Sequence, residues 1–286
     1  ILIAETVLMS ALFIMNAADQ NLQQSTDPTI LAHYKSAGSF PISSLIAPLF
    51  ENISDSNLVL IERFCWWFHI IGILAFLNYL PYSKHLHIVL AFPNTYYSNL
   101  NANGKLNALD AVTDVVAPNF DPSYQAKTDP DNPVRFGVKD VMDLTWKNLL
   151  DAYTCTECGR CTSSCPQNQT GKKLSPRKIM MDTRDRMVEV GKIMDANNGV
   201  FVDDGKSLLD NYISREELWA CNTCNACVQE CPVNINPLEI IVEMRRYMVM
   251  EESQSPAELN NMFSNMENNG APWQFSPSDR ANWINE

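Results

Sequence analysis

Two long apolar runs in the first third of the chain predict membrane-spanning helices. Residues 1–18 are almost wholly apolar and contain one acidic side chain, Glu5. Residues 57–92 form the second run, which has no formal charge between Phe64 and Leu80. A span needs about 20 predominantly apolar residues, so the second run is long enough alone, whereas the first is at the short limit. Because the sequence opens inside the first run and without Met, we expect further chain upstream.

The flanks of the second run predict its orientation. Trp66 and Trp67 stand near one end and Tyr79 and Tyr82 near the other, as in the aromatic belts of membrane helices. Acidic residues precede the run, and lysines follow it. The positive-inside rule therefore places the C-terminal end of the run, and the chain beyond it, in the cytoplasm. We expect a multi-pass protein of the cytoplasmic membrane.

Beyond the second run, the pattern predicts one helical domain between two polar segments. Residues 93–136 are rich in Pro, Asn and Asp and predict a linker, and residues 254–286 predict a polar tail that binds a partner or packs on its own domain. Residues 137–253 between them form the helical domain. Residues 1–92 are predicted to be the C-terminal part of a transmembrane helical bundle. The expected fold class is therefore mainly α.

Local signals predict where the helices of residues 137–253 begin. Ser175-Pro176 is an N-cap followed by proline at the first helical position. Ser214 opens the capping box Ser-Arg-Glu-Glu, and Asn236, also followed by proline, opens the last long helix. Apolar residues at helical spacing from Val138 onward predict a further helix ahead of the first cysteine.

The cysteines add a specific chemistry to this helical domain. The motif C-x2-C-x2-C-x3-C-P occurs twice, from Cys155 to Pro166 and from Cys221 to Pro232. Three closely spaced thiolates can hold three corners of a [4Fe–4S] cube, while the fourth cysteine of this motif ligates the other cube. We assign the ligands of cluster I as Cys155, Cys158, Cys161 and Cys231. We assign the ligands of cluster II as Cys221, Cys224, Cys227 and Cys165.

Zinc and disulfides explain these eight cysteines less well. Structural zinc takes two C-x2-C pairs, so the third C-x2-C step and the trailing Cys-Pro would have no role. Disulfides need an oxidising compartment, and the chain does not resemble a small secreted scaffold. The ninth cysteine, Cys65, is expected to be a small apolar packing residue in the second run. The formal net charge of −12 argues against a nucleic-acid binder.

Two histidines of the second run suggest haem. His69 and His87 are 18 residues apart, which is five whole turns of a regular helix, so both would point the same way about 27 Å apart along the axis. Neutral imidazole is an axial ligand of haem. Each haem b would need a second ligand, expected upstream of residue 1. The alternative is that His69 makes a polar interhelical contact and His87 anchors at the interface. Pro81 lies between them and weakens the assumption of a regular helix.

The second run resembles the last span of the respiratory nitrate reductase gamma subunit and of the cytochrome b subunit of heterodisulfide reductase. The matching residues are His69, Gly72, Pro81, Ser83, Lys84 and His87. This resemblance covers some 35 residues, and it implies that His69 and His87 are haem b ligands.

The spacing of the two cysteine motifs indicates an α-helical ferredoxin. Fifty-five residues, predicted to be mostly helical, separate Cys165 from Cys221, more than in compact hairpin-linked ferredoxins. The domain resembles the iron–sulfur subunits of heterodisulfide reductase, anaerobic glycerol-3-phosphate dehydrogenase, glycolate and lactate oxidases and succinate dehydrogenase. The succinate dehydrogenase branch adds a plant-type cluster domain, for which these residues have no cysteines. The best match is a membrane-anchored heterodisulfide reductase-like protein.

The expected function is electron transfer within an oxidoreductase complex, with no catalytic residue on this chain. Electrons would pass between membrane quinone, haem b, the two [4Fe–4S] clusters and a soluble heterodisulfide reductase-like partner. Its CCG-type cysteine-rich module is absent from these 286 residues. One alternative is a subunit serving a flavoprotein that oxidises a 2-hydroxy acid or glycerol 3-phosphate. The other is a membrane-tethered redox sensor that is not an enzyme.

Overall fold

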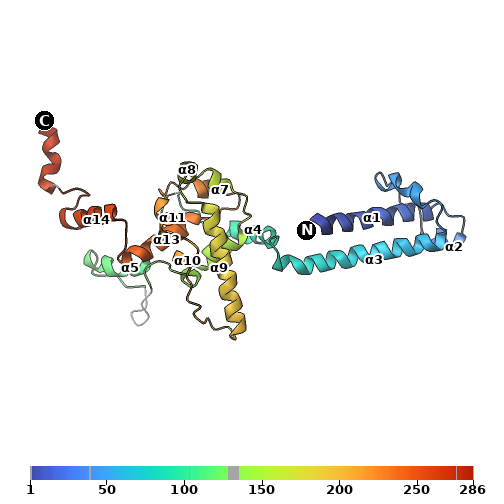
Figure 1. Cartoon of the computed structure of the whole chain (residues 1–286), viewed down its shortest axis with the longest axis horizontal. Coiled ribbons are helices and arrows are strands. Elements are labelled where there is room, and N and C mark those ends of the chain that lie inside the picture. The colour runs from blue at the N-terminus through green and yellow to red at the C-terminus, as the bar shows by residue number, and fades with distance from the viewer. Residues whose placement is uncertain (1, 39, 103, 128–134, 275, 286) are drawn as a thin grey trace. The chain divides into compact units, whose positions relative to one another are not determined.

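The computed structural model describes residues 2–38, 40–102, 104–127, 135–274 and 276–285 (Figure 1). Among these residues the regular elements are helices, and no β-strand is present. The predicted fold class, mainly α with a partial membrane bundle, is therefore confirmed. The chain divides into two compact units, residues 1–86 and 87–286. This division falls inside the second apolar run.

The first unit is a pair of long helices that lie side by side (Figure 1). Helix α1 covers Leu2–Leu22 and helix α3 covers Asp55–Tyr79. Three short elements connect them, namely α2 (Pro28–His33), η1 (Ser43–Leu45) and η2 (Ala47–Phe50). Both long helices are long and apolar enough to cross a membrane.

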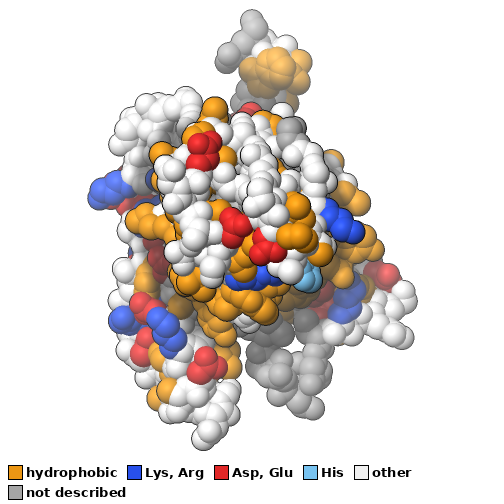
Figure 2. Space-filling view, turned by 90° about the vertical axis from the view of Figure 1, so that its right-hand side faces the viewer, with side chains coloured by type: hydrophobic (Ala, Val, Ile, Leu, Met, Phe, Trp, Pro, Cys, Tyr) orange, Lys and Arg blue, Asp and Glu red, His pale blue; other side chains and the backbone are white. Residues whose placement is uncertain are grey.

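The outer surface of this helix pair is strongly apolar. Large apolar side chains of α3, such as Phe64 and Ile71, are more than half exposed, at 66% and 59%. Hydrophobic side chains are also exposed on the face of the molecule that Figure 2 shows. Exposed apolar surface on helices of this length is typical of a lipid-facing pair, because water would disfavour it.

The second apolar run does not form one helix. Helix α3 ends at Tyr79 and continues as a 3-10 turn, η3 (Leu80–Tyr82), which contains Pro81. Ser83 is then extended, with φ −113° and ψ 164°, before α4 (Leu86–Tyr96) begins. Proline lacks the N–H of a helical hydrogen bond and clashes with the preceding turn, which accounts for the break. The continuous helix from His69 to His87 that the sequence prediction assumed does not form.

The second unit contains two similar halves. In the first, α6 (Trp146–Thr154) leads into the first cysteine motif, followed by α7 (Arg160–Ser163), α8 (Pro166–Gln169) and α9 (Pro176–Ala196). In the second, α11 (Arg215–Ala220) leads into the second motif, followed by α12 (Ala226–Gln229) and α13 (Pro237–Met250). The remaining elements are α5 (Asp110–Val116), η4 (Ala117–Asn119), η5 (Val141–Asp143), α10 (Leu208–Asn211), α14 (Ala257–Asn269) and η6 (Pro277–Asn285).

The predicted helix starts of this unit are confirmed. The side chains of Ser175, Ser214 and Asn236 each accept a hydrogen bond from the backbone N–H three residues later. Ser214 completes a capping box with Glu217, as predicted. The helix predicted from Val138 is wrong at its start, because only the short η5 forms there and regular helix begins at Trp146. The capping box of Thr145 and Asn148 sets that later start.

The core of the second unit lies between α9, α13 and the loops that cross them. Its fully buried apolar side chains come from both halves, including Ile179, Met180, Leu208, Leu218, Ile240, Ile241, Met244 and Met248. Burial of a large apolar side chain contributes about 1.5–3 kcal/mol. The cysteine loops are therefore carried by a packed helical frame.

Gly137 marks a close approach to this frame, and its replacement should be costly. Its φ is +80°, and an added Cβ would lie 2.3 Å from the carbonyl oxygen of Glu243 and 2.4 Å from the N of Tyr247, both in α13. We expect Gly137→Ala to lower the free energy of unfolding by about 2–5 kcal/mol, since it adds backbone overlap to an unfavourable left-handed conformation. Urea unfolding of the anaerobically prepared chain measures this loss.

Gly171→Ala is the matched control for this prediction. Gly171 has φ +81°, but no atom lies within 4 Å of its added Cβ. It should lose only about 1–2 kcal/mol, the conformational part of the effect. Equal losses in the two variants would contradict a packing role for Gly137 against α13.

Candidate iron–sulfur site

The two cysteine loops share one backbone course. The second residue after the first cysteine is left-handed in both loops, with φ 57° at Glu157 and 56° at Thr223. The residue after the second cysteine is left-handed too, with φ 83° at Gly159 and 62° at Asn225. Helices α7 and α12 begin at the next residue. These turns curl each loop around its cysteines, and the N–H of Thr223 lies 3.4 Å from the Sγ of Cys221.

The structure brings the eight motif cysteines together in two groups. One cavity is lined by the first three cysteines of the first motif together with Cys231 and Cys227. A second cavity is lined by the first three cysteines of the second motif together with Cys165. The fourth cysteine of each motif thus lies beside the first three of the other. Cys227 lines both cavities, so the two sites are neighbours.

The donor chemistry of these two groups fits iron–sulfur clusters. Four cysteines from the two motifs line each cavity, with Cys227 added in the first, and an all-thiolate donor set is the one that [4Fe–4S] clusters use. The residues present therefore fit two cubes.

Burial controls the protonation of these thiols. Burial raises the pKa of the Cys155 thiol to about 11 and that of Cys227 to about 12. The backbone N–H of Arg160 lowers the pKa of Cys158, which is exposed. Iron deprotonates the thiols that coordinate it, so cluster assembly has to release protons from the buried cysteines. Cys158 in the first group and Cys224 in the second are exposed, and each gives its group one edge toward solvent.

A buried polar network supports the first group, and sequence reasoning missed it. Asn94 of α4 is fully buried and donates from Nδ2 to the carbonyl oxygen of Val233, 2.9 Å away and two residues after Cys231. Lys147 Nζ donates to Asn94 Oδ1 at 3.0 Å and to Asp151 Oδ1 at 2.6 Å. Burial raises the pKa of Asp151. No local signal marks these residues, because Asn94 lies in a stretch predicted as linker.

The sequence analysis also missed two arginines that occupy equivalent positions in the two halves of the domain. Arg184 in α9 and Arg245 in α13 each reach the cysteine loop of their own half. Arg184 Nη1 binds Glu157 Oε1 at 2.8 Å. Arg245 binds the carbonyl oxygens of Leu218 and Cys221. The signal that could have found them is the repeat itself, since aligning the two halves pairs these residues.

The predicted haem ligands lie in different units of the chain. His69 is in α3, and its Nδ1 lies 2.9 Å from the carbonyl oxygen of Leu8 in α1. If Nδ1 carries the proton, Nε2 keeps the lone pair that an axial ligand needs. His87 is the second residue of α4. Their assignment as haem ligands stays a prediction.

Comparison with known proteins supports an iron–sulfur domain in this chain. Residues 154–235 match the family described as "4Fe-4S dicluster domain". The matched segment holds both cysteine motifs. This chain is 29% identical, over 87% of its length, to the probable iron-sulfur-binding oxidoreductase FadF of Bacillus subtilis, and 29% identical, over 100% of its length, to the EtfAB:quinone oxidoreductase of Syntrophomonas wolfei. It spans 37% and 40% of those two relatives.

Two further relatives match only about half of this chain. A probable membrane-anchored ferredoxin of Chromohalobacter salexigens is 34% identical over 54% of this chain and 25% of its own length. One subunit of a CoB-CoM heterodisulfide reductase of Methanosarcina acetivorans is 32% identical over 41% of this chain and 59% of its own length. No solved structure matches. The relatives are iron–sulfur oxidoreductases and heterodisulfide reductase subunits, and they give the predicted haem b no support.

Proposed function

We propose that this chain is the electron-transfer part of a membrane-bound oxidoreductase, in which two [4Fe–4S] clusters link membrane quinone to a soluble redox protein. The two crossed groups of four cysteines, side by side in one helical domain, carry this proposal. Two helices able to cross a membrane belong to the same chain. The membrane-anchored ferredoxin relative supports the same placement. The cluster domain lies in the cytoplasm, as the lysines after α3 predict.

The residues of the chain hold the clusters and control access to them. Bound [4Fe–4S] clusters supply one-electron transfer. Cys155, Cys165 and Cys227 are buried, while exposed Cys158 and Cys224 face solvent, where a partner can approach. No nucleophile or general base is required for this role.

The soluble partner is proposed to be of the same kind as EtfAB. The relative named EtfAB:quinone oxidoreductase matches along 100% of this chain, membrane helices included. The heterodisulfide reductase relative from Methanosarcina acetivorans matches over 41% of it. A CCG-type cysteine-rich partner, as in heterodisulfide reductases, is the second candidate, and the 32% identity of that match favours it. A flavoprotein that oxidises 2-hydroxy acids or glycerol 3-phosphate ranks below both.

Optical difference spectra of membranes that contain the whole protein test this function. Adding a menaquinol analogue under argon should bleach the broad cluster absorption, and adding the oxidised quinone should restore it. Membranes carrying Cys165→Ser and Cys231→Ser together are the control and should show no such bleach. Cluster absorption that dithionite bleaches but quinol does not would contradict the quinone role and favour a redox sensor. Sharp b-type bands in the same spectra would support His69 and His87 as haem ligands, and their absence would remove both residues.

A further inference from the structure

The two halves of the cluster domain place an arginine at the same position but give it different neighbours. Arg184 lies eight residues after Pro176, the first residue of α9, and Arg245 lies eight residues after Pro237, the first residue of α13. Each side chain reaches back to the loop that holds three cysteines of its own half. The two arginines are therefore structural counterparts, and the comparison between them is internal to one chain.

In the first half the charge of the arginine is neutralised. Arg184 Nη1 lies 2.8 Å from Glu157 Oε1, and Glu157 is the left-handed residue between Cys155 and Cys158. Asp185 adds a second carboxylate at 3.5 Å. An arginine closely paired with a carboxylate has little net field at the neighbouring sulfurs.

In the second half the equivalent loop residue is Thr223, which has no charge. Arg245 donates from Nε to the carbonyl oxygen of Leu218 at 2.9 Å and from Nη2 to the carbonyl oxygen of Cys221, a predicted ligand of cluster II. Its guanidinium carbon stacks 5.0 Å from the centroid of the Trp219 ring. No carboxylate of the described residues forms an ion pair with Arg245, which is partly buried. An arginine does not lose its proton in a protein, so the cation persists.

We propose that Arg245 stabilises the reduced form of cluster II, so that this cluster accepts an electron more readily than it would without the arginine. This inference rests on the two-cluster site proposed above. Reduction adds one negative charge to a cluster, and an uncompensated cation stabilises that charge, whereas a neutral ion pair does so weakly. Arg160 and Arg177 line the first cavity and add positive charge beside cluster I, so the effect of Arg245 is judged within cluster II and not between the two clusters.

Redox titration of the anaerobically prepared whole chain, followed by electron paramagnetic resonance, tests the proposal. The signal that disappears in Cys165→Ser is assigned to cluster II. The ratio of reduced to oxidised cluster II is read from this signal in wild-type chain as the potential is lowered. Arg245→Gln removes the charge but keeps N–H donors, and at a fixed potential it should lower the ratio of reduced to oxidised cluster II about tenfold. Coulomb's law with an effective dielectric constant near 20 gives an effect of this order for one charge close to a cluster. Arg245→Lys should recover most of the ratio.

Glu157→Gln gives the mirror experiment. It leaves the charge of Arg184 partly uncompensated and should raise the reduced fraction of cluster I, with cluster II unchanged. Both clusters present in Arg245→Gln, with an unchanged ratio of reduced to oxidised cluster II, would overturn the proposal. If the Arg245→Gln variant does not hold cluster II, the Glu157→Gln variant decides: an unchanged reduced fraction of cluster I would then overturn the proposal. Fewer than two clusters in wild-type chain, counted from iron and spin, would overturn the two-cluster site and this inference together.

Discussion

Cys165→Ser should remove cluster II and leave cluster I in place, although Cys165 belongs to the first cysteine motif. Its side chain lines the same cavity as Cys221, Cys224 and Cys227. Only 6% of Cys165 is exposed, so no solvent ligand can readily replace it. Iron per chain should fall from about eight to about four, because each cube contains four. Cys231→Ser should cause the same loss of iron, but it should remove the electron paramagnetic resonance signal of cluster I.

Double variants decide whether the ligands are crossed. If Cys165 and Cys221 hold the same cube, Cys165→Ser combined with Cys221→Ala should lose no more iron than either change alone. Cys165→Ser combined with Cys158→Ala should lose both cubes. Ligation within each motif would reverse these two results. Cys65→Ser is the matched control, since Cys65 lies in α3 and should leave the iron content unchanged.

The parts of this structure that the sequence could predict depend on neighbours close along the chain. A cysteine motif keeps three ligands within seven residues, and an N-cap such as Ser175 bonds to a residue three positions later. Such signals survive without knowledge of the tertiary fold. The crossed ligand assignment also follows from the motif, because the fixed spacing prevents the fourth cysteine from closing the first cube, and it stays a prediction.

The parts that could not be predicted depend on contacts distant along the chain. Asn94 forms a hydrogen bond with Val233, which lies 139 residues later in the chain. No residue near Asn94 in the sequence distinguishes it from the polar residues of a linker. Aligning the two halves pairs Arg184 with Arg245, but the different hydrogen-bond partners of these arginines depend on the folded chain. The end of α3 is a different case, since Pro81 was visible in the apolar run, but apolar composition outweighed it in the prediction.

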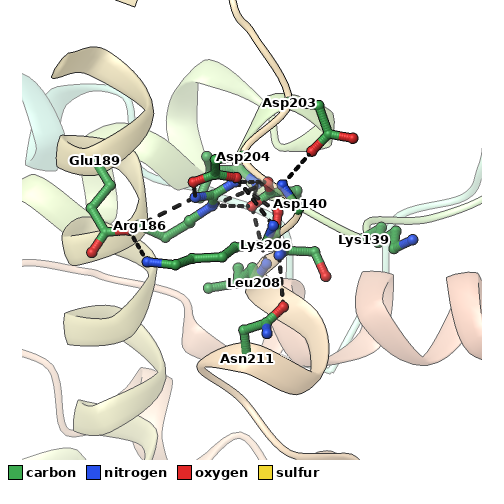
Figure 3. Close-up of polar contacts among 12 residues, drawn as sticks. Lys139, Asp140, Arg186, Glu189, Asp203, Asp204, Lys206, Leu208 and Asn211 are labelled. Atoms are coloured by element: carbon green, nitrogen blue, oxygen red, sulfur yellow. Dashed lines mark hydrogen bonds and ion pairs between the residues drawn. The ribbon is translucent and has the colours of Figure 1, made fainter. Parts of the chain in front are cut away.

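Arg186→Met should strongly destabilise the folded chain. Arg186 is completely buried in α9 and joins three segments (Figure 3). Its Nη2 lies 2.8 Å from Asp140 Oδ2, its Nη1 lies 2.6 Å from Asp204 Oδ2, and Nη2 also donates to the carbonyl oxygen of Lys206. Removing one partner of such a network leaves charge without compensation, which costs about 3–5 kcal/mol. Urea unfolding of the anaerobically prepared chain measures the loss.

Two further variants separate this network from the general effect of changing a basic residue in α9. Arg186→Lys should remain strongly destabilised, because a single ammonium group cannot form paired hydrogen bonds with two carboxylates. Lys192→Met, at an exposed position of the same helix, should change the free energy of unfolding by less than about 0.5 kcal/mol. Full stability in Arg186→Lys would show that charge alone, and not the hydrogen-bond geometry, holds these segments.

The same network predicts how stability depends on pH. Hydrogen bonds from Arg186 lower the pKa of Asp204 from 3.8 to about 2. A carboxylate with a lowered pKa stabilises the folded state fully above its unfolded value, and this contribution is lost as pH falls toward the folded value. The difference in unfolding free energy between wild type and Asp204→Asn should therefore be constant from pH 7 to about 5 and shrink steadily below pH 4. Acid damage to the clusters is common to both chains and cancels in this difference. A difference that stays constant down to pH 3 would mean that Asp204 acts through packing and not through its charge.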